Sequence, residues 1–244
     1  MVHGRNMCLR VWGDFACFTR PEMKVERFSY AVPTPSAVRG ILDAVYCKPT
    51  EFRWQVTKIE LLKPIQYIAL RRNEVKDKAP NPATILRWAE GGQVTPIIAD
   101  GDRDLLGTDQ KGRTQRQTMA LRDVAYRVHA HVRPWPGHED KLNGIENQFL
   151  RRAENGKCFV QPCFGCREFP AYFELAIHET DPAPIPLTQD LGWMVYDVFD
   201  LSQPNDQFAL AYVSLFNAQM QDGVVTVPAF EDEAVRKPEG GATC

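Results

Sequence analysis

The sequence has no apolar run of about 18 or more residues, the length that a membrane-spanning helix needs. Its first residues, "MVHGRNMCLRVWGD", contain no apolar stretch typical of a secretory signal. Its seven cysteines are odd in number and irregularly spaced, so we expect no disulfide framework in a chain of 244 residues. These absences argue against insertion and export, and the sequence predicts a cytoplasmic protein with no membrane partner.

The motifs of several large enzyme classes are also missing. No GxxxxGK[ST], GxGxxG, GxSxG or HExxH string occurs, so phosphate-loop, dinucleotide-binding, serine hydrolase and zinc protease functions have no motif support. The "CFGC" segment at 163–166 lacks a second ligand pair at useful spacing, and a structural zinc site needs four ligands. We favour turn or packing cysteines there, and we expect neither a metal nor another cofactor.

Charge is divided unevenly along the chain. Residues 1–167 carry 27 Lys and Arg against 18 Asp and Glu, whereas residues 168–244 carry 2 against 13. A basic body with an acidic end is typical of proteins that bind a polyanion through one part of their surface. Solvated basic faces are equally common, so nucleic-acid binding and an ordinary surface both remain open.

The hydrophobic pattern predicts an α+β fold. Apolar residues at Val38, Ile41, Leu42 and Val45 follow helical spacing, and Pro49 should end that helix near Tyr46. The other expected elements are strands at 7–18, 52–75 and 119–134, short helices within 81–93 and 137–157, a long loop at 99–118, and short strands from 158 with a hairpin turn at Asp222-Gly223.

This order of elements suggests three parts. Residues 1–135 suit an N-terminal ferredoxin-like domain of the RNA-recognition (RRM/RAMP) type. Residues 136–230 suit a helix with an appended C-terminal antiparallel β-sheet region. Residues 231–244 are expected to form a frayed tail.

Several basic segments are candidates for RNA contact. Cations neutralise phosphates and aromatic rings stack on unpaired bases, although a solvated loop is the alternative for each segment. Strand 119–134 is expected to be half-buried, with a basic exposed face that also carries His131. The candidates are Arg20, Lys24, Arg27, Tyr30 and Arg39 in the first basic segment, Arg71 and Arg72 in "RRNE", Arg113 and Arg116 in "GRTQRQ", and Arg127 and His129 on that strand.

A set of linked segments resembles one known family. "VWGDFACFTRPEMKVERFSYAVPTPSAVRGILDAVYCKPT", "LLKPIQ", "RRNEV" and "FGCREFPAYF" are similar to the Cas-five family of CRISPR-associated RAMP proteins, in its type I-C (Dvulg) form. The likeness extends from about residue 7 to 227, and the combination is more specific than any single motif. Lys48 in the first segment and Arg167 in the last are further expected RNA contacts.

The resemblance implies a fold and a function. It implies an RRM-like domain with an appended β-sheet, and an endoribonuclease that cuts CRISPR repeat RNA in pre-crRNA without a metal. It further implies that the protein stays on the crRNA 5′ handle in the Cascade complex, beside Cas-seven and Cas-eight type subunits, and meets target DNA through that complex. A catalytically inactive scaffold that only binds the 5′ handle is the alternative.

The family's cleavage residues carry over unevenly. Tyr46 matches the active-site tyrosine at the end of the first helix, but the stretch "HEDKLNGIENQF" has no adjacent Lys-His pair. Lys141 and His138 are the nearest substitutes, and His131 is a further acid or base candidate. An imidazole moves protons readily at neutral pH, whereas a phenol is a poor base there, so Tyr46 is expected to orient the RNA.

Overall fold

The computed structural model describes residues 4–94, 96, 97, 99, 107, 112–176, 182–204 and 212–238. The chain forms two compact units, one of residues 1–68 with 119–244 and one of residues 69–118. The predicted boundary near residue 135 does not coincide with this division, because strands before and after residue 135 belong to one sheet. The two units divide instead within the long strands β4 (Tyr67–Val75) and β5 (Arg113–Pro134).

The N-terminal half contains most of the long strands. Its elements are β1 (Met7–Ala16), η1 (Pro21–Met23), β2 (Arg27–Phe28), α1 (Pro35–Val45), β3 (Phe52–Leu61), β4 (Tyr67–Val75), α2 (Pro82–Ala89) and β5 (Arg113–Pro134). The C-terminal half contains η2 (Glu139–Lys141), α4 (Leu142–Glu154), β6 (Tyr172–Leu175), β7 (Gln189–Asp197), β8 (Ser214–Gln221), β9 (Val224–Thr226) and β10 (Val235–Arg236). The predicted α+β class is confirmed.

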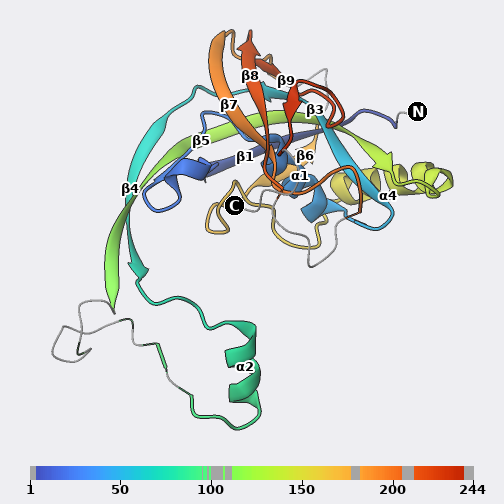
Figure 1. Cartoon of the computed structure of the whole chain (residues 1–244). Helices are drawn as coiled ribbons and strands as arrows, with labels where there is room; N and C mark the ends of the chain where they lie inside the picture. The colour runs from blue at the N-terminus through green and yellow to red at the C-terminus, as the bar shows by residue number, and fades with distance from the viewer. Residues whose placement is uncertain are drawn as a thin grey trace. The chain divides into compact units, whose positions relative to one another are not determined.

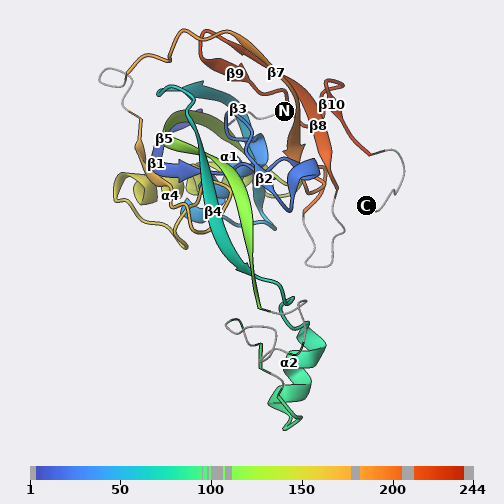
Figure 2. The ribbon, with the colours of Figure 1, turned by 90° about the vertical axis from the view of Figure 1, so that its left-hand side faces the viewer.

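A large antiparallel sheet organises the main unit. Its strand order is β10-β8-β9-β3-β5-β1-β6, with β7 paired to β8 and with β2 and β4 paired to β5. Strand β5 is the centre, because it pairs antiparallel with both β1 and β3. Helices α1 and α4 contact each other and pack against β3 and β6 respectively (Figure 1). Strands β7, β8 and β10 gather beyond β3 (Figure 2).

Helix α1 begins and ends where its sequence predicts. The Thr34 hydroxyl accepts a hydrogen bond from the backbone N–H of Ala37, and Pro35 occupies the first turn, the favoured arrangement at a helix start. Its apolar face is buried against the sheet. The helix ends at Val45, and Tyr46 has extended backbone angles, as the nearby Pro49 predicts.

Trp54 on β3 joins the two helices to the sheet. Its ring lies 4.6 Å from that of Phe149 on α4 and 5.5 Å from that of Phe52. Its indole N–H donates to the Tyr46 carbonyl at 3.1 Å. All three rings are fully buried, so the core of the main unit lies directly behind the end of α1.

The predicted exposed basic face of strand 119–134 is wrong. Arg127 is 7% exposed and His129 is 2% exposed, and both side chains contact Glu60 on the neighbouring β3, at 2.6 Å and 3.1 Å. A buried charge needs a partner, and Glu60 supplies one from a distant segment. Val128 on the opposite face is buried as expected, so β5 is covered on both sides here.

Two boundaries at loops and tails also need correction. Residues 113–118, expected in a long loop, begin strand β5, while most of 99–112 lies outside the described residues. Residues 235 and 236, expected in the frayed tail, form β10 against β8. Residues 239–244 lie outside the described part. The Asp222-Gly223 hairpin is confirmed, with φ of 48° and 74°.

None of the helices in the described ranges has both the length and the apolar composition needed to cross a membrane. None of the six described cysteines is joined to another by a disulfide.

We predict that Asp197→Ala lowers the free energy of unfolding by about 1–3 kcal/mol. The buried Asp197 carboxylate accepts two hydrogen bonds from Arg39, at 2.7 Å and 3.0 Å, and its removal leaves the half-buried guanidinium with Asp43 as its remaining carboxylate partner. Urea denaturation followed by circular dichroism measures the effect. Asp14→Ala removes an exposed carboxylate and should change stability by less than about 0.5 kcal/mol; equal losses in the two variants would contradict the prediction.

Candidate active site at the end of helix α1

The last carbonyl groups of α1 are satisfied by three separate segments. The Ala44 carbonyl accepts from the backbone N–H of Phe159 at 2.7 Å. The Val45 carbonyl accepts from Nε of Arg152 on α4 at 2.6 Å, and the Tyr46 carbonyl accepts from Trp54 on β3. Carbonyls at a helix end lack partners within the helix and carry partial negative charge, so these bonds fix where Tyr46 lies.

The Tyr46 ring is held in a row of aromatic side chains. It stacks on Phe52 at 5.9 Å with an interplanar angle of 25°, and on Phe159 at 6.2 Å with an angle of 26°. Phe52 is buried in the core, whereas Phe159 is 59% exposed. Tyr46, itself 7% exposed, therefore lies between the core and the surface with its ring plane fixed from both sides.

Two lysines share one carboxylate near Tyr46, and one of them, Lys48, lies directly beside the tyrosine. Lys48 Nζ donates to Glu51 Oε2 at 3.1 Å, and Lys141 Nζ donates to Glu51 Oε1 at 3.1 Å. The hydrogen bond to Glu51 and, next, the Tyr46 hydroxyl raise the pKa of Lys48. The bonds from Lys48 and then Lys141 lower the pKa of Glu51. Together these side chains form the Tyr46 cluster: Tyr46, Lys48, Glu51 and Lys141.

Lys141 reaches this cluster because the turn before α4 is bound to the turn after α1. The Trp135 backbone N–H donates to the Glu51 carbonyl at 2.9 Å, and its indole N–H donates to the Pro49 carbonyl at 2.8 Å. The Lys141 N–H then donates to the His138 carbonyl at 3.1 Å. His138 therefore lies on the same turn as Lys141, close to the cluster, and its Nδ1 is buried.

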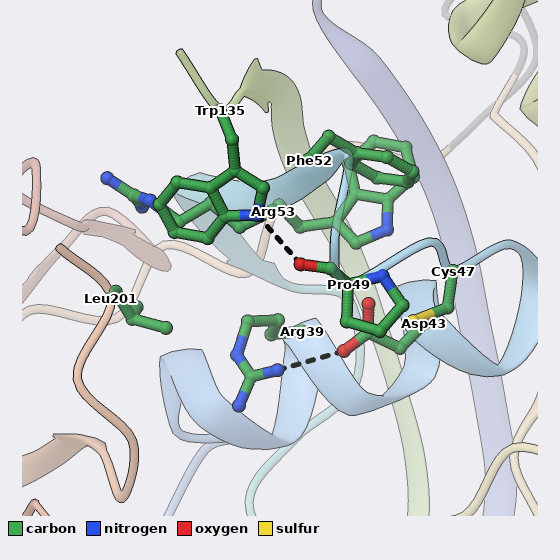
Figure 3. A pocket seen from close by; sticks show the side chains of 9 residues that line it. Arg39, Asp43, Cys47, Pro49, Phe52, Arg53, Trp135 and Leu201 are labelled. Carbon is green, nitrogen blue, oxygen red and sulfur yellow. Dashed lines mark hydrogen bonds and ion pairs between the residues drawn. The ribbon is translucent and has the colours of Figure 1, made fainter. Parts of the chain in front are cut away.

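A small pocket lies behind the turn after α1 (Figure 3). Arg39 and Asp43 of α1 line it and form an ion pair at 2.9 Å, and Trp135 closes the opposite wall. Burial and the neighbouring Asp43 raise the pKa of the Cys47 thiol to about 12, so this thiol stays protonated at neutral pH. A protonated thiol is a weak nucleophile, and the pocket offers less reactive chemistry than the Tyr46 cluster.

The charges and hydrogen-bonding groups of the Tyr46 cluster suit the binding of an anion that has a transferable proton nearby. Two ammonium groups face one carboxylate, so the cluster carries a surplus positive charge at neutral pH. The phenol can orient an oxygen atom by a hydrogen bond, and the lysines can stabilise added negative charge. The lysines and Glu51 lie at the surface, where a ligand phosphate can compete for them.

The predicted site residues fall into separate groups. Tyr46, Lys48 and Lys141 lie together with His138 nearby, as described above. His131 lies on β5 opposite Gln55 and so belongs to the central sheet and not to the turn that carries His138.

A second group surrounds the "CFGC" turn. Arg27 contacts Cys166 Sγ and the Glu168 carboxylate, each at 3.6 Å, so it lies beside the exposed Arg167. The backbone needs Gly165 here, because its φ is +81° and an added Cβ would collide with the Cys17 carbonyl. Arg20 and the exposed Lys24 complete this group on η1 and its flanks.

A third group belongs to the smaller unit and is described by itself. Arg71 and Arg72 lie on β4, while Arg113 and Arg116 lie on the first part of β5. Arg71 and Arg113 are exposed. Arg116 pairs with Glu74 at 3.4 Å.

Three predicted contact residues are buried instead, and a fourth, Arg39, is half-buried. Arg127 and His129 pair with Glu60, and Arg39 pairs with Asp43 and Asp197, as described above. Tyr30 is 3% exposed and lies under the Arg20 guanidinium at 4.6 Å. The expectation that Arg127, His129 and Tyr30 are exposed to RNA is wrong, because each is enclosed by partners from other segments. The guanidinium of the half-buried Arg39 is held by Asp43 and Asp197.

Sequence reasoning missed three residues of the site. Glu51, Arg152 and Phe159 carry no motif, and two of them lie more than a hundred positions after Tyr46. Only the three-residue spacing between Lys48 and Glu51, which is typical of an ion pair within one turn, could have indicated Glu51. Across the described ranges, no group of three or more His, Cys, Asp and Glu residues is arranged to hold a metal ion.

The sequence matches one protein-family model over most of its length. The model, described as CRISPR-associated protein Cas5 and labelled Cas5d, matches residues 7–228. A protein of Mannheimia succiniciproducens named CRISPR pre-crRNA endoribonuclease Cas5d is 40% identical, over 94% of this chain and 97% of that protein. A protein of the same name from Thermus thermophilus is 37% identical, over 96% of each chain.

A solved structure has the same fold. It is described as the crystal structure of a CRISPR-associated protein, with a TM-score of 0.63 and 24% identity over 97% of this chain and 98% of that one.

We predict that Glu51→Gln lowers the pKa of Lys48 toward the ordinary lysine value, because the carboxylate is the main cause of its increase. NMR titration of the lysine Nζ and Cε signals measures this change. Glu154→Gln removes an exposed carboxylate on α4 and should leave the pKa of Lys48 unchanged. A Lys48 titration that is the same in wild type and Glu51→Gln would contradict the predicted coupling.

The pKa shifts of Lys48 and Glu51 determine how pH changes the contribution of these two residues to stability. Because the pKa of Lys48 is raised, its contribution to stability is present below the ordinary lysine pKa and is lost as pH rises through the raised value. Because the pKa of Glu51 is lowered, its contribution is present above the ordinary carboxyl pKa and is lost as pH falls through the lowered value. The ion pairs of Glu51 with Lys48 and Lys141 are therefore intact throughout the neutral pH range.

Proposed function

The chain belongs to the Cas5d family of CRISPR-associated proteins, and from this premise we propose that it is an endoribonuclease that cuts the repeat in pre-crRNA. The observation that carries the proposal is the Tyr46 cluster, in which the buried Tyr46 phenol lies beside Lys48, and Lys48 and the distant Lys141 meet on Glu51. The named activity of the two curated relatives, at 37–40% identity over nearly the whole chain, supports the same reaction.

We propose that the RNA supplies its own nucleophile and that no metal is required. The 2′-hydroxyl loses its proton and bonds to the adjacent phosphorus atom, and the bond from phosphorus to the 5′-oxygen breaks. The leaving 5′-oxygen takes up a proton, so the products are a 2′,3′-cyclic phosphate and a 5′-hydroxyl. The protein must align these groups, move the protons and stabilise added charge on the phosphate.

Each side chain of the cluster suits one of these tasks. The Tyr46 hydroxyl, held by two stacked rings, orients the 2′-hydroxyl or the phosphate. Lys48 and Lys141 stabilise the charge that develops on the phosphate oxygens, once the phosphate competes with Glu51 for them. His138, on the Lys141 turn, is the candidate proton carrier, and His131 on the central sheet is a weaker one.

We infer that the domain around this cluster is RRM-like, with a ferredoxin-like topology. The order β3-β5-β1-β6, with all three pairs antiparallel, supports this inference, because along the chain α1 lies between β1 and β3, and α4 lies between β5 and β6. This is the β-α-β-β-α-β arrangement. Strands β7 to β10 then extend the sheet as the appended region.

The wider role is proposed on the family alone. We propose a type I-C Cascade subunit that remains on the crRNA 5′ handle in the cytoplasm. It would act beside Cas-seven and Cas-eight type subunits and meet target DNA only through that complex. The proposed RNA contacts are the exposed or half-buried residues Arg20, Lys24, Arg27, Lys48, Arg71, Arg72, Arg113, Arg116 and Arg167.

One observation favours a second function, a scaffold that binds the 5′ handle without cutting. The family resemblance leads us to expect an adjacent Lys-His pair in the stretch "HEDKLNGIENQF", but Asn143, Gly144 and Ile145 occupy that region and no such pair occurs. The proton carrier would then be missing, while phosphate binding by the two lysines would remain.

Tyr46→Phe should slow cleavage of the protein's own repeat RNA by roughly 10²-fold in EDTA, with RNA binding nearly unchanged. The substitution removes only the hydroxyl and keeps the stacked ring. Gel assays of rate and affinity measure the two effects. Lys141→Ala and His138→Ala in the same assay test the other roles.

Tyr172→Phe is the matched control, because this exposed tyrosine lies on β6, and it should cut at the wild-type rate. Tight binding with intact RNA for every protein would establish the scaffold in place of the enzyme. Cleavage that survives Tyr46→Phe unchanged would refute the role given to Tyr46.

Arg71→Ala should weaken RNA binding most at low salt and reduce the slope of log affinity against log salt by about 0.7. The exposed Arg71 guanidinium on β4 is proposed to neutralise one phosphate of a single strand. Fluorescence anisotropy over a salt series measures the slope. Arg87→Ala on α2, with the same change in net charge, should keep the wild-type slope; a loss of slope in both variants would indicate general charge attraction and no contact at Arg71.

A further inference from the structure

We propose that Phe159, together with Arg152, forms a stacking platform for the unpaired nucleobase next to the scissile phosphate. This inference rests on the proposed function, because it places the platform beside the Tyr46 cluster. It names a positioning role for two residues that carry no motif.

The first support is the exposure of an apolar pair at this place. Phe159 is 59% exposed and the adjacent Val160 is 65% exposed, although the core of the main unit lies directly behind them. A phenylalanine ring normally contributes to stability by burial. This ring instead lies at the surface beside the candidate catalytic tyrosine.

The second support is that Phe159 is fixed in place despite its exposure. Its backbone N–H is bonded to the Ala44 carbonyl, and its ring packs against Tyr46 with planes only 26° apart. A ring whose backbone and one neighbour are fixed loses little conformational freedom when a ligand stacks on it. The site is therefore preorganised for a flat partner.

The third support is the chemistry of Arg152. Its guanidinium carbon lies 4.0 Å from the Phe159 ring centroid while its Nε is bonded to the Val45 carbonyl. Among the residues that the structure describes, no carboxylate is paired with this guanidinium. A nucleobase stacks on an aromatic ring or on a guanidinium plane, and the cation attracts the neighbouring phosphate. RNA offers both groups at once.

The geometry also indicates which nucleotide is bound. The Phe159 and Tyr46 rings are direct neighbours, with centroids 6.2 Å apart. A base on Phe159 therefore belongs to a nucleotide that adjoins the phosphate at Tyr46. The platform requires that base to be unpaired, so it selects a single-stranded segment.

The test uses the repeat RNA with 2-aminopurine placed in turn at each unpaired position. A 2′-deoxyribose at the mapped cut position blocks cleavage; if the wild type leaves the RNA intact, the unmodified RNA is used. The proteins are wild type, Phe159→Ala, Phe159→Leu and Phe159→Tyr, with Val160→Ala as the control for an exposed apolar neighbour. Circular dichroism and thermal unfolding confirm that each is folded.

We expect fluorescence quenching at one position beside the cut in wild type, Phe159→Tyr and Val160→Ala, and its loss in Phe159→Ala and Phe159→Leu. Phe159→Leu keeps an apolar cover over Tyr46 but has no flat ring, so it separates stacking from packing. Loss of the platform should weaken binding roughly 5- to 150-fold. In cleavage assays it should raise KM more than it lowers kcat.

Quenching that is equal in all five proteins would overturn the platform, whether or not the RNA is cut. Loss of quenching only in Phe159→Ala would assign Phe159 to packing on Tyr46 and would also overturn it. Absence of cleavage by the wild type, with quenching that depends on Phe159, would refute the proposed enzyme and retain a stacking site.

Discussion

The candidate site depends on how the carboxyl end of α1 is satisfied. Three successive carbonyls, of Ala44, Val45 and Tyr46, accept bonds from Phe159, Arg152 and Trp54. Orphan carbonyls at a buried helix end are costly, and a cation there also complements the helix dipole. One local requirement therefore brings α4, β3 and the segment after α4 to the same point. Because each donor comes with a ring or a guanidinium, satisfying the helix end also builds the aromatic row around Tyr46.

Electrostatics at the surface then decides what this point can bind. Glu51 holds Lys48 and Lys141 at equal distances of 3.1 Å, which keeps two like charges together in the absence of a ligand. Exposed ion pairs contribute little to stability, so a phosphate can replace the carboxylate at small cost. Glu51 thus preorganises the two lysines and leaves them accessible to a ligand. This balance suits a site that must be stable when empty and still accept a polyanion.

Local parts of this arrangement were predictable, and its long-range parts were not. The spacing of Val38 and Val45 together with Pro49 correctly placed the end of α1, because helix periodicity and proline geometry act within a few residues. The alternation in strand 119–134 correctly identified β5 but misjudged its charged face, because the partner of Arg127 and His129 is Glu60, some seventy residues earlier. Phe159 had no local signature either. Its position follows from a bond to Ala44 that only the folded chain creates.

The position of Lys141 shows how a site can tolerate a changed motif. The two bonds of Trp135, to the Pro49 and Glu51 carbonyls, join the turn before α4 to the turn after α1. Lys141 reaches Glu51 from there through its flexible side chain, whereas an imidazole has shorter reach and depends more on its exact position. The charge-stabilising part of the proposed reaction therefore depends less on the exact path of the turn. The proton-transfer part, which falls to His138, depends on the precise path of the turn.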